Sequence, residues 1–415
     1  MRTEVAEPLQ SQASSYLRWG VCGLLFFATT INYIDRQVLS ILKPTLQAQF
    51  GWREADYSWV VVAFQLAYAL MMPLAGRLID RLGTRLGYAL AVAVWSAAAA
   101  SHAFARSAIQ FMFARFALGM GEAGNFPAAV RTVADWFPQE ERALATGVFN
   151  SGTNVGVIAA AVLVPAITLS LGWQAAFLVT GGLGLLWIVP WLIIMPKKKR
   201  AVTDRAYRTG RATPYNELLR NRGSWAFIVG KFATDPVWWF YLFWIPGFLN
   251  STYGVDLTSI GPPLIAIYLA ADVGSIGGGW LYKFFAARGW TPNAARKTAM
   301  LVCALAATPV MLLLWVQTLW PAVLLIGLAA AAHQGWSVNL FTVVSDTVPG
   351  QDVASVVGLG GLAGGISGML ISPVVGYWLD FSNGAYRPIF FVAGTAYVAA
   401  LIVIHAIIPQ LRGRQ

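Results

Sequence analysis

Long apolar segments separated by short polar turns run along the whole chain. Each segment is long enough to cross the ~30 Å hydrocarbon core of a bilayer as a helix. The pattern predicts twelve spans, at residues 17–42, 57–76, 86–105, 108–134, 141–168, 173–195, 223–250, 258–286, 296–316, 319–345, 354–380 and 386–409. The one long polar interval divides them six and six. The sequence therefore predicts an all-α membrane protein with an N-terminal bundle (1–195), a basic linker (196–222) and a C-terminal bundle (223–415).

Composition agrees with this pattern. Hydrophobic residues make up 57% of the 415 positions and charged residues 11%, whereas a soluble domain carries ~25% charge. The first apolar run, 17–34, has no small-residue cleavage site after it and is interpreted as a retained span. Cys22 and Cys303 both lie inside apolar runs. They are expected to pack in the bundle, and neither a disulfide nor a metal site is expected.

Basic residues are distributed by topology. They fill the central linker and recur after the second and eighth spans, at Arg77, Arg81, Arg85, Arg288, Arg296 and Lys297. Because Lys and Arg near short loops favour the cytoplasmic side, the linker and both termini are predicted to be cytoplasmic. The net charge of +11 is not gathered into a patch interleaved with aromatic residues. Nucleic-acid binding is therefore not expected.

An internal repeat supports two equivalent halves. A shift of 211 residues aligns three residues of the turn after the fourth span with three after the tenth: Asp135, Pro138 and Gly147 with Asp346, Pro349 and Gly358. Duplicated halves are typical of transporters that hold their substrate between two bundles near the membrane midplane.

A few charges interrupt the apolar segments: Asp35, Arg36, Arg115, Glu122, Asp235 and Asp272. A charge at bilayer depth costs ~2.5–3.5 kcal/mol unless it faces protein or water. These residues are therefore interpreted as marking a route through the membrane. Gly119, Gly121 and Gly124 match the GxGxxG dinucleotide pattern but lie inside a span, where close helix contact explains them better.

The segment GRLIDRLGTR, Gly76 to Arg85, resembles the signature loop of the major facilitator superfamily. That resemblance implies a conformational latch formed by Gly76, Asp80, Arg81, Gly83 and Arg85. Gly76 would let a helix end approach its neighbour, and Asp80 would accept hydrogen bonds at a helix N-terminus. A looser copy without the acid lies at 279–297.

Four further strings narrow the resemblance: NYIDR (32–36), RFALGMGEAGNFPA (115–128), DPVWWFYLFWIPGFL (235–249) and AAHQGWSVNLFTVVSD (331–346). They resemble the anion:cation symporters, and within these the hexuronate transporters. The resemblance implies two pseudo-symmetric six-helix bundles and a monomer in the bacterial inner membrane. It also implies import of galacturonate and glucuronate with protons by alternating access, with no cofactor, metal or enzyme activity. A carrier of another sugar acid, such as galactonate, and a proton-driven exporter remain alternatives.

A hexuronate needs a cation for its carboxylate, and an arginine fork suits that task. Arg36 and Arg115 are the candidates. Arg115 and Glu122 lie two turns apart on one helical face, which is expected to line a cavity. Asp35 and Glu122 are predicted to couple protons, because an unprotonated acid competes with the substrate for an arginine. A static Asp35–Arg36 pair and a structural hydrogen bond of Glu122 are the alternatives.

The predicted wall of the site takes hydroxyl, amide and aromatic groups from both halves: Tyr33, Tyr68, Thr153, Asn154, Trp239 and Tyr241. The repeat places Glu122 on His333, so the second half is predicted to supply hydrogen bonds and stacking from His333, Gln334, Trp336 and Asn339. Ordinary interhelical packing, or an interfacial aromatic belt in the seventh span, are the alternatives. Lys231, one turn before Asp235, is placed to neutralise it.

Overall fold

Helices form almost the whole of the chain that the computed structural model describes, which comprises residues 15–137, 139–195, 214–348 and 353–410. The first half contains α1 (Ser15–Phe50), α2 (Glu54–Ser101), η2 (His102–Phe104), α3 (Ala108–Glu122), α4 (Asn125–Trp136), α5 (Gln139–Leu171) and α6 (Trp173–Ile194). The second half contains α8 (Tyr215–Leu218), α9 (Arg222–Tyr253), α10 (Gly261–Ala286), α11 (Pro292–Ala307), η3 (Thr308–Leu314), α12 (Leu319–Thr347), α13 (Val353–Phe381) and α14 (Arg387–Ile407).

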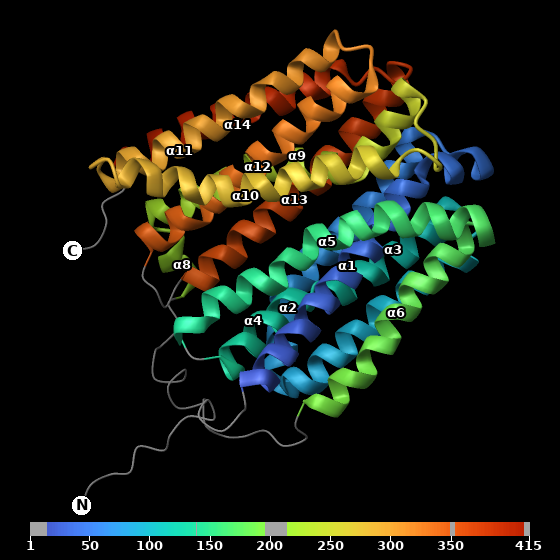
Figure 1. The fold of residues 1–415 in the computed structure, drawn as a ribbon, viewed down its shortest axis with the longest axis horizontal. Coiled ribbons are helices and arrows are strands. Elements are labelled where there is room, and N and C mark those ends of the chain that lie inside the picture. Colours follow the sequence, from blue (N-terminus) through green and yellow to red (C-terminus); the bar gives the residue numbers. More distant parts are fainter. Residues whose placement is uncertain (1–14, 138, 196–213, 349–352, 411–415) are drawn as a thin grey trace, which may run out of the picture.

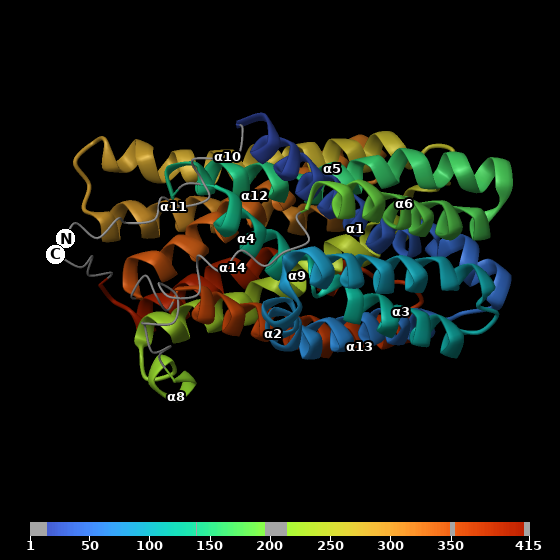
Figure 2. The same ribbon diagram turned by 90° about the horizontal axis from the view of Figure 1, so that it is seen from below.

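The two halves form separate bundles that meet along a shared face. In Figure 1 the blue-to-green helices α1–α6 group together, and the yellow-to-red helices α9–α14 form the second group. Figure 2 shows the helices of both groups running roughly along the long axis of the molecule. Contacts between the bundles join α13 to α2, α10 to α5 and α9 to α1. The predicted fold, twelve membrane helices in two six-helix bundles, is confirmed.

Ten helical segments in the described residues are long and apolar enough to cross a membrane. The fourth predicted span is missing from the ten because it is divided into α3, of 15 residues, and α4, of 12. The seventh corresponds to α9, which is long enough at 32 residues. Lys231, Asp235 and several Trp and Tyr residues lower its hydropathy.

The second and third spans lie within α2 on either side of a break at Gly83, so the second helix ends later than predicted. The predicted turn from Gly76 to Arg85 is helical within α2 except at Gly83, whose φ of 77° and ψ of 160° break the helix. A positive φ of this kind favours glycine, which has no Cβ to clash. A Cβ at Gly76 would meet nothing within 4 Å, so Gly76 does not bring a helix end against a neighbour.

The three glycines of the fourth span permit close packing of α3 on α2, as predicted. A Cβ at Gly119 would lie 2.5 Å from the Phe64 carbonyl oxygen, and one at Gly121 would lie 2.5 Å from the Trp95 main-chain nitrogen. Gly124 faces Ala91 in the same way. This close contact holds the fourth span, with its charged residues, against the centre of the N-terminal bundle.

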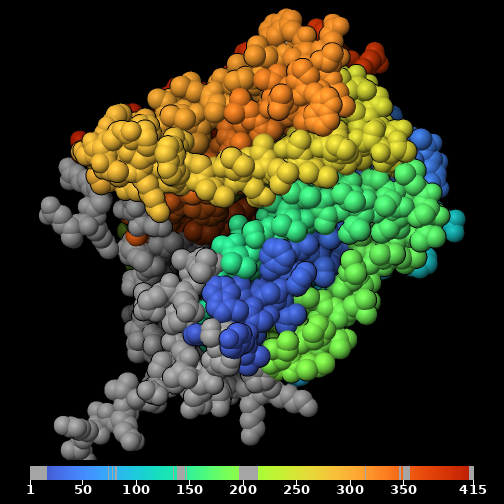
Figure 3. Space-filling model, viewed as in Figure 1, coloured from blue at the N-terminus to red at the C-terminus, as the bar shows by residue number. Residues whose placement is uncertain are grey.

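The bundles are tied together at one end, called here the far end, where α1 turns into α2 and α9 into α10. The Asp380 carboxylate at the end of α13 accepts hydrogen bonds from the main-chain nitrogens of Glu54 and Ala55, at 2.8 and 2.9 Å. The Tyr57 hydroxyl donates to the Phe243 carbonyl oxygen at 2.8 Å. Towards the opposite, near end, Figure 3 shows the surface hollowed between α10 and α5. The bundles are therefore tied together at the far end, and α10 and α5 separate at the near end.

Candidate functional site

A buried ion pair between α1 and α3 joins two of the predicted charges. Arg36 donates from Nε and Nη2 to the same oxygen of Glu122, Oε2, at 3.0 and 2.7 Å. Arg36 is 3% exposed and Glu122 is fully buried. The alternative of a static pair between Arg36 and its neighbour Asp35 is wrong, because the arginine crosses to α3 instead.

Aromatic rings surround the Arg36 guanidinium. Its Cζ lies 4.5 Å from the centre of the Tyr33 ring, 5.2 Å from Tyr68 and 5.8 Å from Trp239. The Phe64 ring is 5.0 Å away. These distances fall within the ~6 Å range of cation–π contacts. Because Trp239 belongs to α9 and the other rings to α1 and α2, this aromatic box spans the boundary between the bundles.

Arg115 and Asp35 lie beside this pair and are also buried. Nη2 of Arg115 donates to the main-chain oxygen of Arg36 at 3.2 Å. Its other two nitrogens, and both carboxylate oxygens of Asp35, have no hydrogen-bond partner among the described residues. Together with Arg36 and Glu122 they make a cluster of two basic and two acidic side chains. Arg115 supports α1 in this conformation and does not line an open surface, contrary to expectation.

A second polar cluster occupies the C-terminal bundle around His333. Its Nδ1 forms a hydrogen bond with the Tyr397 hydroxyl at 2.7 Å, and its ring stacks on Trp238 at 4.8 Å. The Trp336 ring meets Tyr397 edge-on at 5.7 Å and is fully buried. His333 therefore has the packed and satisfied surroundings that were the alternative to a direct substrate contact.

Lys231 and Asp235 form the predicted ion pair on α9, with Nζ and Oδ2 2.8 Å apart. The side chains are 13% and 15% exposed. Trp239, Tyr241 and Trp244 of the same helix are buried, which excludes the interfacial belt for these three rings.

The remaining wall candidates lie in other surroundings. The Asn154 amide donates to the Asp272 carboxylate, a contact between α5 and α10 across the bundle boundary. The Asn339 amide donates to the carbonyl oxygens of Gly278 and Gly335, both at 2.9 Å, and so ties α12 to α10. Thr153 and Tyr241 are buried and Gln334 is half-buried. The structure does not bring these residues into the aromatic box around Arg36.

Only part of the predicted latch can be placed. The side chains of Asp80 and Arg81 lie outside the described residues. Arg85 donates to the Leu192 carbonyl oxygen at 2.8 Å, and its own carbonyl oxygen accepts from the Trp191 indole at 3.0 Å. These bonds attach α2 to the end of α6 within one bundle.

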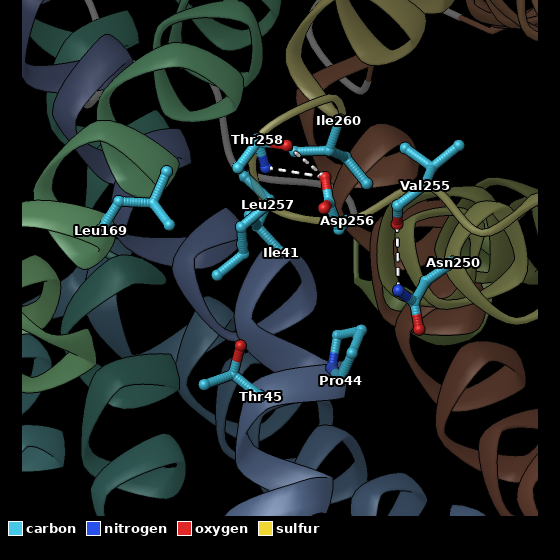
Figure 4. A pocket seen from close by; sticks show the side chains of 10 residues that line it. All are labelled: Ile41, Pro44, Thr45, Leu169, Asn250, Val255, Asp256, Leu257, Thr258 and Ile260. Carbon is cyan, nitrogen blue, oxygen red and sulfur yellow. Dashed lines mark hydrogen bonds between the residues drawn. The ribbon is translucent and has the colours of Figure 1, made fainter.

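A cavity of about 330 Å³ lies at the far end, lined by residues of α1, α5 and the turn from α9 to α10 (Figure 4). Asp256 and Asn250 point towards it, and Asn250 donates to the Val255 carbonyl oxygen at 3.0 Å. None of the predicted substrate-binding residues is among those lining it.

Sequence reasoning missed three residues that complete these clusters. Phe64 contacts both arginines, with its ring centre 5.0 Å from Arg36 Cζ and 5.9 Å from Arg115 Cζ. Tyr397 and Trp238 hold His333. Phe64 and Tyr397 are ring residues within apolar spans and carry no signal that separates them from packing residues. Trp238 and Trp239 are adjacent, and they differ only in the direction in which each side chain leaves the helix.

A charge cluster on the face where two six-helix membrane bundles meet is typical of membrane transporters. Comparison with known proteins agrees with this class. Residues 25–372 match the sequence model of the Major Facilitator Superfamily, so the chain belongs to this family.

Two curated relatives carry names that concern sugar acids. The chain is 31% identical to the hexuronate transporter of Escherichia coli (strain K12), over 95% of this chain and 94% of that protein. It is 35% identical to the galacturonate transporter of Dickeya chrysanthemi, over 65% and 82% respectively. A bacterial homologue of the human lysosomal transporter Spinster, solved inward-facing and unoccupied, shares the fold with a TM-score of 0.75 at 20% identity, covering 95% of this chain and 96% of that one.

Proposed function

We propose that the protein imports hexuronates such as galacturonate and glucuronate together with protons, by alternating access, in the bacterial inner membrane. The observation that carries the proposal is the Arg36–Glu122 ion pair inside an aromatic box at the bundle boundary. The curated relatives named for hexuronate and galacturonate support this substrate class. With the linker and termini in the cytoplasm, as the basic residues predict, the separated near end faces the cell interior.

The geometry of the pair suggests how a proton and an anion would be linked. Oε2 of Glu122 accepts both Arg36 hydrogen bonds, whereas Oε1 has no hydrogen-bond partner among the described residues. A proton on this carboxyl group removes its negative charge and weakens its hold on the guanidinium. Arg36 then binds the substrate carboxylate through the same planar fork. Release of the proton restores the ion pair and expels the sugar acid.

The aromatic box suits the rest of such a substrate. A pyranose ring presents apolar C–H faces that pack on aromatic rings, and the Tyr33 and Tyr68 hydroxyls offer hydrogen bonds. Asp35 is the second proton-coupling candidate, because it is buried without a hydrogen-bond partner among the described residues. Arg115 positions Arg36 through the bond to its main-chain oxygen.

The test is uptake of labelled galacturonate by liposomes containing only this protein, with the outside more acidic than the inside. Wild-type protein is expected to accumulate substrate and to respond to the pH gradient. Glu122→Gln is expected to abolish accumulation but to retain exchange of internal for external substrate, because a neutral side chain mimics the protonated state. Arg36→Gln is expected to abolish both. Glu217→Gln, at an exposed position of α8, serves as the matched control.

Gradient-driven accumulation by both Glu122→Gln and Asp35→Asn would overturn the proton assignment. Uptake of galactonate but not of hexuronates would instead indicate the related sugar-acid carrier, and outward pumping would indicate the exporter.

A further inference from the structure

The Lys231–Asp235 pair lies one helical turn from the aromatic box, and the proposed function gives it no role. Lys231, Asp235 and Trp239 follow one another at intervals of four residues and therefore share one face of α9. Trp239 is the residue of this face that meets Arg36, at 5.8 Å. We propose, on the basis of the proposed function, that Asp235 binds the hydroxyl groups at the end of the sugar acid opposite its carboxylate. Asp235 thereby selects monocarboxylates against dicarboxylic sugar acids.

The packing around Asp235 fixes its position. A Cβ added at Gly364 of α13 would overlap the Asp235 carboxylate, and one at Gly368 would lie 2.5 Å from the Trp239 indole. Two successive turns of α9 thus fit against two glycines that are one turn apart on α13. This packing fixes the position of the Asp235 carboxylate relative to the Trp239 indole.

The charge at this point suits hydroxyl groups. Oδ2 of Asp235 lies 2.8 Å from Lys231 Nζ, and among the described residues no donor to Oδ1 is found. A carboxylate only accepts hydrogen bonds, so the free oxygen favours a hydroxyl donor and disfavours a second carboxylate. Both side chains retain some exposure, 13% for Lys231 and 15% for Asp235, in contrast to the buried Arg115.

The spacing also fits the size of the substrate. Four residues along a helix correspond to a rise of about 6 Å. In the ring form of a hexuronate, four bonds separate the carboxyl carbon from the anomeric oxygen, which spans about 5 Å at bond lengths of about 1.5 Å. A hexuronate bound by Arg36 and lying across Trp239 therefore brings its far hydroxyl groups towards Asp235.

The experiment measures how well galacturonate and galactarate compete with labelled galacturonate, first for the wild type and then for two variants. In Asp235→Asn the negative charge is lost, and the ratio of inhibition by galactarate to inhibition by galacturonate is expected to rise by about tenfold or more. In Lys231→Gln the negative charge is no longer neutralised, and the ratio is expected to shift the other way. Size-exclusion profiles verify that both variants are folded.

A purely structural role would impair both variants without opposite shifts in the ratio, and that result overturns the inference. The wild type supplies an independent readout that does not depend on a variant folding. Methyl galacturonide, which lacks the free anomeric hydroxyl, is expected to compete at least several-fold less well than galacturonate, and equal competition would also overturn the inference. Absence of binding by every sugar acid would contradict the proposed function itself.

Discussion

Because Glu122 and Arg36 form a buried ion pair, they say more about the kind of substrate the site accepts than a pair on the surface would. Removing one partner of a buried ion pair typically costs about 3–5 kcal/mol, because the other charge is left without compensation. Any substrate that separates this pair must therefore supply a replacement carboxylate at the same place. Such a requirement favours anions over neutral sugars at the level of a single side chain.

Asp256, in the turn from α9 to α10, gives a pH-dependent prediction. Hydrogen bonds from Thr258 and Ser259 hold the pKa of its carboxyl group below the ordinary value. A lowered pKa stabilises the folded turn at pH values above the unfolded pKa, and this contribution is lost as the pH falls through the folded pKa. Proteolysis within 254–260 is therefore expected to be faster in Asp256→Ala than in wild type at neutral pH. The difference should vanish in acid, and a constant difference at every pH would contradict the assignment.

The charged residues of the candidate site were predictable from the sequence, whereas their partners were not. Arg36, Arg115 and Glu122 stand out because the bilayer tolerates charges only where protein or water compensates them. Which acid pairs with Arg36 depends on how α1 is rotated relative to α3. The adjacency of Asp35 to Arg36 in the sequence does not reveal this rotation. Phe64 is chemically ordinary and becomes part of the site only through that packing.

At the scale of helices, glycines decide how closely two elements approach. Gly121→Ala would place a Cβ against the Trp95 main chain at 2.5 Å, where neither backbone has room to move. We expect a loss of about 1–3 kcal/mol in stability, the usual cost of overpacking. Thermal unfolding in detergent measures the effect.

Gly147→Ala on α5 is the matched control, since a Cβ there meets nothing within 4 Å. It is expected to leave the melting temperature unchanged or slightly raised, because alanine favours the helix. Equal melting temperatures for the two variants would show that α3 and α2 do not pack as closely as described.

Helix boundaries were predicted well where polar turns separate the apolar runs, and poorly at the ends of the first, second and fourth spans. Helix α1 continues to Phe50, eight residues beyond the predicted end of the first span. The segment from Gly76 to Arg85 is polar enough to be interpreted as a loop, yet its main chain stays helical up to Gly83. Conversely, the fourth span was predicted as one helix but breaks after Glu122, where α3 ends and α4 begins at Asn125. Hydropathy indicates which residues enter the membrane and says little about where the main-chain hydrogen bonds are interrupted.

At the scale of the whole molecule, Asp380 links the bundles by capping a helix that belongs to the other half. Its carboxylate accepts from the first main-chain nitrogens of α2, the position at which a negative charge also favours the helix dipole. Asp380→Ala is expected to loosen the far end and to expose the buried Ser372, whose hydroxyl donates to Gln65 of α2.

The measurement uses Ser372→Cys in a background with Cys22→Ala and Cys303→Ala. Labelling by a membrane-impermeant maleimide should be several-fold faster when Asp380→Ala is added, because the first main-chain nitrogens of α2 then lose their cap. Asp56→Ala, which removes an acid of the same helix end without a contact to the second bundle, is the control. Unchanged labelling would mean that other contacts keep the far end closed.

Helix α13 packs through glycines on α9 of its own bundle and on α2 of the other, and this packing bears on the alternating access proposed above. Gly364 and Gly368 fit against α9, while Gly361 and Gly365 face Met72 and Ala69 of α2. At Gly361 and Gly365 no α13 side chain interlocks with α2, so these two turns offer little steric resistance when the bundles move past each other in the proposed cycle. We therefore expect a low barrier between the inward-facing and outward-facing orientations of the proposed cycle. Substrate binding and release, and not the movement of the bundles, would then limit the turnover rate.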